Sequence, residues 1–150
     1  MKKTVAHESR SILAIAVFIA GALAGSAGIA TAGEINVKLS GDQEVPPVQT
    51  TASGQGTVTV EDDKSIKGKI TTSNIKGTGA HVHDAPVGKN GPDIITLNKT
   101  GDNEWSIPSG AKLTDAQYDA FKAGGLYINV HSDEHKSGEI RGQLKRALDR

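Results

Sequence analysis

The chain has 150 residues with 17 basic and 17 acidic side chains, so its formal net charge at pH 7 is zero. A chain without a basic excess lacks the charged surface with which proteins bind nucleic acid or anionic lipid, and aromatic residues for base stacking make up only 3%. Cysteine is absent, which excludes disulfides and thiol catalysis. We therefore expect no nucleic-acid partner.

The first 32 residues have the pattern of a secretory signal peptide. Basic residues precede an apolar run over residues 12–30, which ends in the cleavage-type motif Ala30-Thr31-Ala32. The run is not followed by the basic cluster that is typical of a membrane anchor. The sequence predicts an exported protein, periplasmic or secreted, with no membrane segment after residues 1–32 are removed. The domain itself is expected over residues 33–150, with a net charge of about −2.

Residues 33–150 alternate apolar and polar side chains in short runs that are separated by Gly, Asp, Asn and Pro, which is the pattern of β-strands. Asp62-Asp63-Lys64 predicts a tight hairpin turn, and Val45-Pro46-Pro47-Val48 predicts a bend or a sheet edge. Eight strands are predicted in chain order, over residues 35–40, 56–61, 65–72, 79–83, 94–97, 104–107, 126–131 and 138–145.

One helix is predicted before the last two strands. Thr114 as N-cap and Gln117 three residues later form a capping box, Leu113 and Tyr118 can form a hydrophobic staple, and Gly124-Gly125 ends the helix. Eight short strands with one helix in a connection predict an all-β domain, built either as an antiparallel Greek-key sandwich of two sheets or as a flattened barrel.

The histidines of residues 33–150 fall in two short clusters. His81 and His83 share one face of their predicted strand, whereas Val82 points to the other face, and His131 likewise points away from the aliphatic face of its strand. Side chains two residues apart on a strand are about 6 to 7 Å apart at their roots, a span that two imidazoles can close around one ion. A neighbouring second strand would add His131, and His135 in the acidic loop that follows could supply a fourth nitrogen.

Ligand chemistry indicates which ion such a cluster would hold. Imidazole nitrogens suit zinc, copper or nickel, whereas calcium and magnesium require oxygen ligands. The absence of cysteine and of any methionine beyond the initiator excludes sulfur-based copper sites. We therefore predict one copper or zinc ion, with the ligands His81, His83, His131 and His135. Nearby carboxylates that could bind the ion or fix an imidazole tautomer are Asp84, Asp133 and Glu134.

Five stretches of the chain carry a family resemblance, namely residues 39–48 (LSGDQEVPPV), 79–88 (GAHVHDAPVG), 90–97 (NGPDIITL), 125–132 (GLYINVHS) and 138–144 (GEIRGQL). They resemble the CHRD domain, which is named for its occurrence in chordin. The resemblance covers nearly all of residues 33–150 and implies a secreted all-β domain that is immunoglobulin-like or barrel-like. It implies little about activity, since the chordin copies accompany modules that bind growth factors and bacterial members are mostly small exported proteins or parts of surface proteins.

Two of these features also have structural interpretations. Within residues 138–144, Glu139, Arg141 and Gln143 face one way and the aliphatic residues face the other, so we interpret this motif as structural. Trp105 is predicted to be a core residue rather than a recognition aromatic.

The histidine strand is also similar to the copper-ligand strand of copper/zinc superoxide dismutases. The chain lacks the bridging-histidine and zinc-ligand region and the cysteines of those enzymes, so the similarity implies copper ligation by His81 and His83 only. Dinucleotide, Walker and nucleophile-elbow motifs are missing. We therefore favour a non-catalytic module that binds a metal ion. The alternatives are a surface interaction module with structural histidines, whose partner is another extracellular or periplasmic protein, and a copper-dependent, dismutase-like enzyme.

Overall fold

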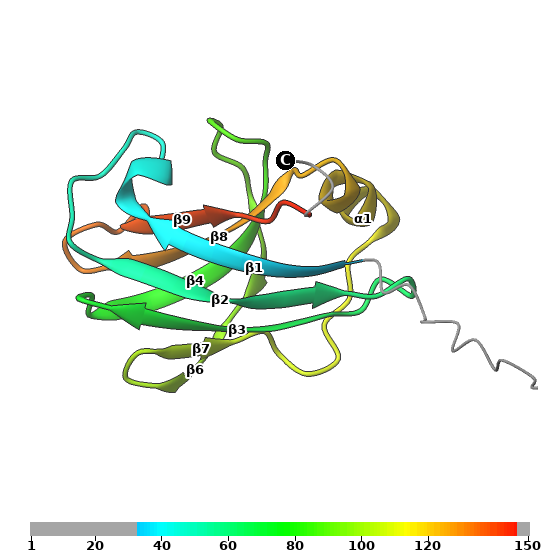
Figure 1. The fold of residues 1–150 in the computed structure, drawn as a ribbon, viewed down its shortest axis with the longest axis horizontal. Coiled ribbons are helices and arrows are strands. Elements are labelled where there is room, and N and C mark those ends of the chain that lie inside the picture. Colours follow the sequence, from blue (N-terminus) through cyan, green and yellow to red (C-terminus); the bar gives the residue numbers. More distant parts are fainter. Residues whose placement is uncertain (1–32, 147–150) are drawn as a thin grey trace, which may run out of the picture.

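Nine antiparallel strands and one α-helix form residues 33–146, the part of the chain that the computed structural model describes (Figure 1). The predicted signal peptide lies outside these residues. None of the described helices is long and apolar enough to span a membrane. The elements are β1 (Gly33–Ser40), the 3-10 helix η1 (Gly41–Gln43), β2 (Ser53–Val60), β3 (Ile66–Ser73), β4 (Gly77–Asp84), β5 (Asp93–Thr96), β6 (Asn98–Gly101), β7 (Glu104–Ser106), α1 (Asp115–Lys122), β8 (Leu126–Ser132) and β9 (Ile140–Gln143).

All nine strands join in one sheet, in the order β5-β4-β8-β9-β1-β2-β3-β7-β6. The edge strands β5 and β6 are consecutive in the chain and only Leu97 separates them, with its N–H donating to the carbonyl of Ala80 at 2.9 Å. The two edges of the sheet therefore come together, and the sheet curls into a flattened, nearly closed barrel (Figure 1). This arrangement confirms the predicted all-β class and favours the barrel over two separate sheets.

The eight predicted strands are all present, and their ends differ from the prediction by at most three residues. A ninth strand, β6, was not predicted because its sequence NKTG is polar and mostly exposed, so it carries no alternating pattern. It forms as the partner of β7 in a hairpin. In the turn between β2 and β3, Lys64 rather than an aspartate adopts the left-handed conformation, at φ 68°.

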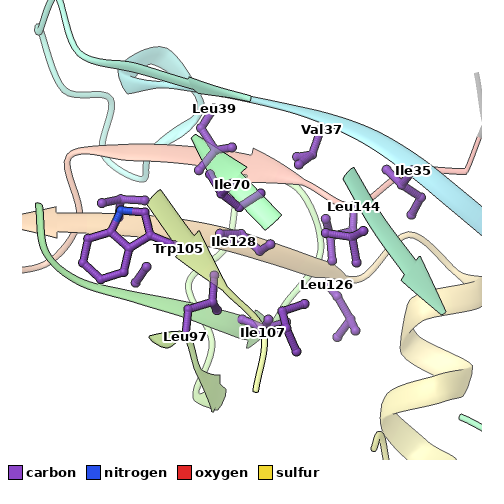
Figure 2. Packing of buried hydrophobic residues seen from close by; sticks show 14 of the residues in the cluster. Ile35, Val37, Leu39, Ile70, Leu97, Trp105, Ile107, Leu126, Ile128 and Leu144 are labelled. Carbon is purple, nitrogen blue, oxygen red and sulfur yellow. The ribbon is translucent and has the colours of Figure 1, made fainter. Parts of the chain in front are cut away.

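The interior of the barrel is filled mainly by aliphatic side chains (Figure 2), which alternate with more exposed residues along strands such as β1 and β3. Trp105 is 2% exposed and lies in this core, as predicted. The inward residues of β4 include Ala80 and Val82, and those of β8 are Leu126, Ile128 and Val130.

The helix α1 begins and ends where the sequence predicts. The Thr114 side chain accepts a hydrogen bond from the Gln117 N–H at 3.2 Å, and Gln117 Oε1 accepts one from the Thr114 N–H at 2.9 Å, which completes the capping box. Gly124 ends the helix in the left-handed conformation, at φ 72°. The helix lies at one end of the barrel and leads the chain directly into β8 (Figure 1).

Candidate metal site

The two histidine segments lie on neighbouring strands. β4 and β8 pair antiparallel in a register that sets His81 opposite Asn129, His83 opposite Tyr127 and His131 opposite Gly79. Since the residues between the histidines point into the core, all three histidines project from the outer face of the sheet. The fold thus brings together side chains that are 50 residues apart in the sequence.

The three imidazole rings converge on one point. His81 Nδ1 lies 3.0 Å from His131 Nε2, and the ring centres of His81 and His83 are 5.7 Å apart. One nitrogen from each ring lies within 4.8 Å of the other two, and each residue is half-buried. The group therefore offers three nitrogen ligands to a single ion.

Backbone carbonyls determine which nitrogens are available. His83 Nδ1 lies 3.0 Å from the carbonyl oxygen of Gly91, and His131 Nδ1 lies 2.9 Å from that of Lys136. A carbonyl can only accept, so both Nδ1 atoms carry the proton and both Nε2 atoms present a lone pair. Metal-binding histidines are held in their tautomer by this kind of hydrogen bond.

The spacing of one pair of ring nitrogens is close to that of two zinc ligands. Two nitrogens at 2.0–2.1 Å from a tetrahedral zinc are about 3.3 Å apart, close to the 3.0 Å between His81 Nδ1 and His131 Nε2. His83 Nε2 is buried and has no hydrogen-bond partner among the described residues, although a buried polar atom is normally paired. A metal ion at this point would satisfy it.

Comparison with known families identifies the family of the chain. The model of the CHRD domain matches residues 35–144, which is most of the chain. The chain belongs to the CHRD family. CHRD domains are generally found in extracellular proteins. No curated protein and no solved structure gives a significant match to the chain.

Burial changes the pKa of two histidines in this CHRD domain. It lowers the pKa of His81, and the neighbouring imidazoles of His131 and His83 lower it further. Burial also lowers the pKa of His131, although the hydrogen bond to the Lys136 carbonyl acts in the opposite direction. The pKa is lowered in both residues, which favours the neutral imidazole, the form that binds metal.

Asp93 is an acidic neighbour of the CHRD site that the sequence analysis did not select. It begins β5, where it pairs with His83. Its negative charge acts against burial and makes the lowering of the pKa of His81 and His131 smaller. Its side chain is exposed and can offset the charge of a bound cation. Pairing the predicted strands 79–83 and 94–97 as a hairpin would have placed Asp93 beside the histidines.

The structure does not bring His135 into this group. The residue is half-buried in the turn after β8, where its N–H donates to Ser132 Oγ at 3.2 Å and its carbonyl accepts from Gly138 at 3.1 Å. Asp133 and Glu134 are exposed in the same turn. The acceptors of the imidazole N–H groups of His83 and His131 are thus backbone carbonyls rather than the carboxylates that we considered.

A buried carboxyl group also lies on the outer face of the CHRD sheet. Glu44 is 6% exposed, and its Oε1 has no partner among the described residues. A Cβ added to Gly138 would lie 2.5 Å from this oxygen and 2.6 Å from Asn129 Nδ2, so the three residues share one small space. Burial raises the pKa of Glu44 to about 7, although the charge of Arg141 opposes the shift.

Glu44 should make the stability of the protein depend on pH. The pKa of Glu44 is higher in the folded protein than the unfolded value of 4.5. Its contribution to the free energy of unfolding is therefore complete below about pH 4.5 and is lost as the pH rises through about 7. Replacing Glu44 with Gln should remove this loss, which amounts to at most roughly 3 kcal/mol. Urea unfolding at pH 5 and pH 8 measures the effect. Glu104→Gln is the control at an exposed glutamate, and its free energy of unfolding should depend on pH as in the wild type. If the free energy of unfolding of Glu44→Gln also changes between pH 5 and pH 8 as in the wild type, the assignment is refuted.

Proposed function

We propose that this protein is an exported CHRD-domain binding protein that holds one copper or zinc ion through His81, His83 and His131. The observation that carries the proposal is the convergence of three ring nitrogens from two strands, with two of the lone pairs directed by backbone carbonyls. Export is supported by the signal-like residues 1–32 and by the extracellular setting of CHRD domains.

The ion would bind where the metal-free protein has a proton between His81 Nδ1 and His131 Nε2. In the metal-free protein, His131 Nε2 presents a lone pair, so the 3.0 Å contact requires His81 Nδ1 to donate. Binding would require that proton to move from His81 Nδ1 to Nε2 of the same ring, which leaves His81 Nδ1 and His131 Nε2 free to coordinate, since a ligating imidazole must be deprotonated at the nitrogen that binds. The set of three imidazoles suits zinc or copper, and Asp93 supplies negative charge nearby.

Metal content of the purified protein tests this proposal. After incubation with Cu(II) or Zn(II) and removal of loosely bound ions, elemental analysis should find one ion per chain. His83→Ala and His131→Ala should each retain far less than one ion. His135→Ala is the matched control, because it removes a histidine that lies outside the group. A wild-type protein that holds no stoichiometric metal would overturn the proposal.

A second candidate is a protein-interaction module with structural histidines. It is favoured by one observation, that His81, His83 and His131 each have a hydrogen bond without any ion. In that case the partner is another extracellular or periplasmic protein, and His83→Ala leaves its binding unchanged. Enzymatic activity would require more than metal binding, namely turnover by the copper-loaded protein that is lost with His131→Ala.

A further inference from the structure

The ring of His83 is stacked on Tyr127. The two ring centres are 4.8 Å apart and the planes differ by 5°. The guanidinium carbon of Arg141 lies 3.5 Å from the centre of the same tyrosine ring. Since β8 lies between β4 and β9, the histidine and the arginine approach Tyr127 from the two flanking strands. Tyr127 and Arg141 are 2% and 1% exposed, so both are enclosed by neighbouring residues.

Arg141 also fastens the loop of residues 85–92 to the sheet. Its guanidinium donates to the carbonyl of Lys89 at 2.9 Å, to that of Pro86 at 3.2 Å and to Gln143 Oε1 at 2.9 Å. Gln143 adds a bond from its amide to the Ala85 carbonyl at 2.9 Å. The loop therefore lies across the outer face of β8 and β9.

The same loop holds the edge of the His83 ring. The carbonyl of Gly91 accepts from His83 Nδ1, and the N–H of Gly91 donates to the Tyr127 hydroxyl at 3.4 Å. His83 is thus held on its face by Tyr127 and at its edge by Gly91. Arg141 contacts the tyrosine directly and fixes the loop that contains the glycine.

We propose that Tyr127 and Arg141 are positioning residues of the metal site, which hold His83 in the orientation and tautomer that offer Nε2 to the ion. This inference rests on the proposed function. An imidazole that is already held loses less conformational freedom when it binds, and the outer partners of metal ligands typically change affinity by about 10- to 100-fold. The arginine of the GEIRGQL segment thereby acts on the site as well as on the fold.

The affinity and the spectrum of bound Cu(II) test the inference. Tyr127→Leu removes the stacked ring and should weaken Cu(II) binding about 10- to 100-fold in competition with a chelator, with altered hyperfine splitting in the electron paramagnetic resonance spectrum. Tyr127→Phe keeps the ring and loses only the long bond to Gly91, so its affinity should stay within about threefold of wild type. Arg141→Lys keeps the charge but loses the planar contact with Tyr127 and several of the hydrogen bonds to the loop. Its affinity should therefore lie between those of Tyr127→Leu and Tyr127→Phe.

Phe121→Leu is the matched control. It also shortens a fully buried aromatic residue, but one on α1 and away from the histidines, so both affinity and spectrum should remain those of wild type. Melting curves without metal establish that each variant is folded.

The outcomes separate the two proposals. Failure of the wild-type protein to bind either Cu(II) or Zn(II) overturns the proposed function and the inference together. Wild-type binding with unchanged affinity and spectrum in Tyr127→Leu overturns the inference alone. Equal weakening in Tyr127→Leu and Phe121→Leu also overturns it, because the loss would then reflect general destabilisation.

Discussion

Saturating Cu(II) or Zn(II) should raise the melting temperature of the protein by roughly 10 °C. An ion that binds only the folded state adds about 2.7 kcal/mol at a concentration 100 times its dissociation constant. For a domain of this size, each kcal/mol shifts the melting temperature by about 3 to 5 °C. Thermal unfolding at increasing metal concentrations measures the effect, and the shift should grow with the logarithm of the free ion concentration.

The response should depend on the three converging rings. His83→Ala should remove most of the shift, since it deletes an imidazole nitrogen that is buried without a hydrogen-bond partner among the described residues. His135→Ala should retain the shift if the three-ring group is sufficient. Chelator should return the wild-type protein to its metal-free melting temperature. A melting temperature that changes with neither Cu(II) nor Zn(II) would exclude specific binding to the folded state.

Gly91→Ala should impair both the fold and the site. A Cβ at this position would overlap the carbonyl oxygen of Asp84 and lie 2.9 Å from the Ala85 side chain, so the loop of residues 85–92 must shift. The shift would break the hydrogen bond from His83 to the Gly91 carbonyl. We expect a loss of about 1–3 kcal/mol in the free energy of unfolding from overpacking, and at least about 10-fold weaker metal binding.

Urea unfolding and chelator competition measure the two effects of this substitution. Gly101→Ala is the matched control, because a Cβ there would make only ordinary contacts, with the Glu104 side chain at 3.5 Å or more. Its stability should change by less than about 0.5 kcal/mol and its metal affinity should not change. Similar behaviour of the two alanine variants would contradict the role given to the loop.

The sequence was sufficient to predict much of the fold because the signals are local. Alternation identified the strands and which face each histidine occupies, and the capping box at Thr114 and Gln117 located the helix. The strand β6 was missed because its stability comes from pairing with β7 rather than from its own polar residues. Closure of the sheet was one of two alternatives, since strand order depends on contacts that are remote in sequence.

The candidate site was predictable only in its outline. The sequence does not show that β4 pairs with β8, so the approach of His131 to His81 could be predicted only for the case that the two strands are neighbours. The acceptors at Gly91 and Lys136 are main-chain atoms, and any residue type could supply them. Asp93 and Arg141 act from β5 and β9, so their nearness to the histidines depends on the order of strands across the sheet.

The meeting of β5 and β6 also affects how the protein behaves in concentrated solution. Each edge strand has only four residues, and the two lie next to one another instead of at opposite ends of an open sheet. Short and adjacent edges offer few unpaired backbone groups to the strand of another molecule. Assembly of copies by strand addition is therefore disfavoured, even though no cysteine cross-link secures the ends of the sheet.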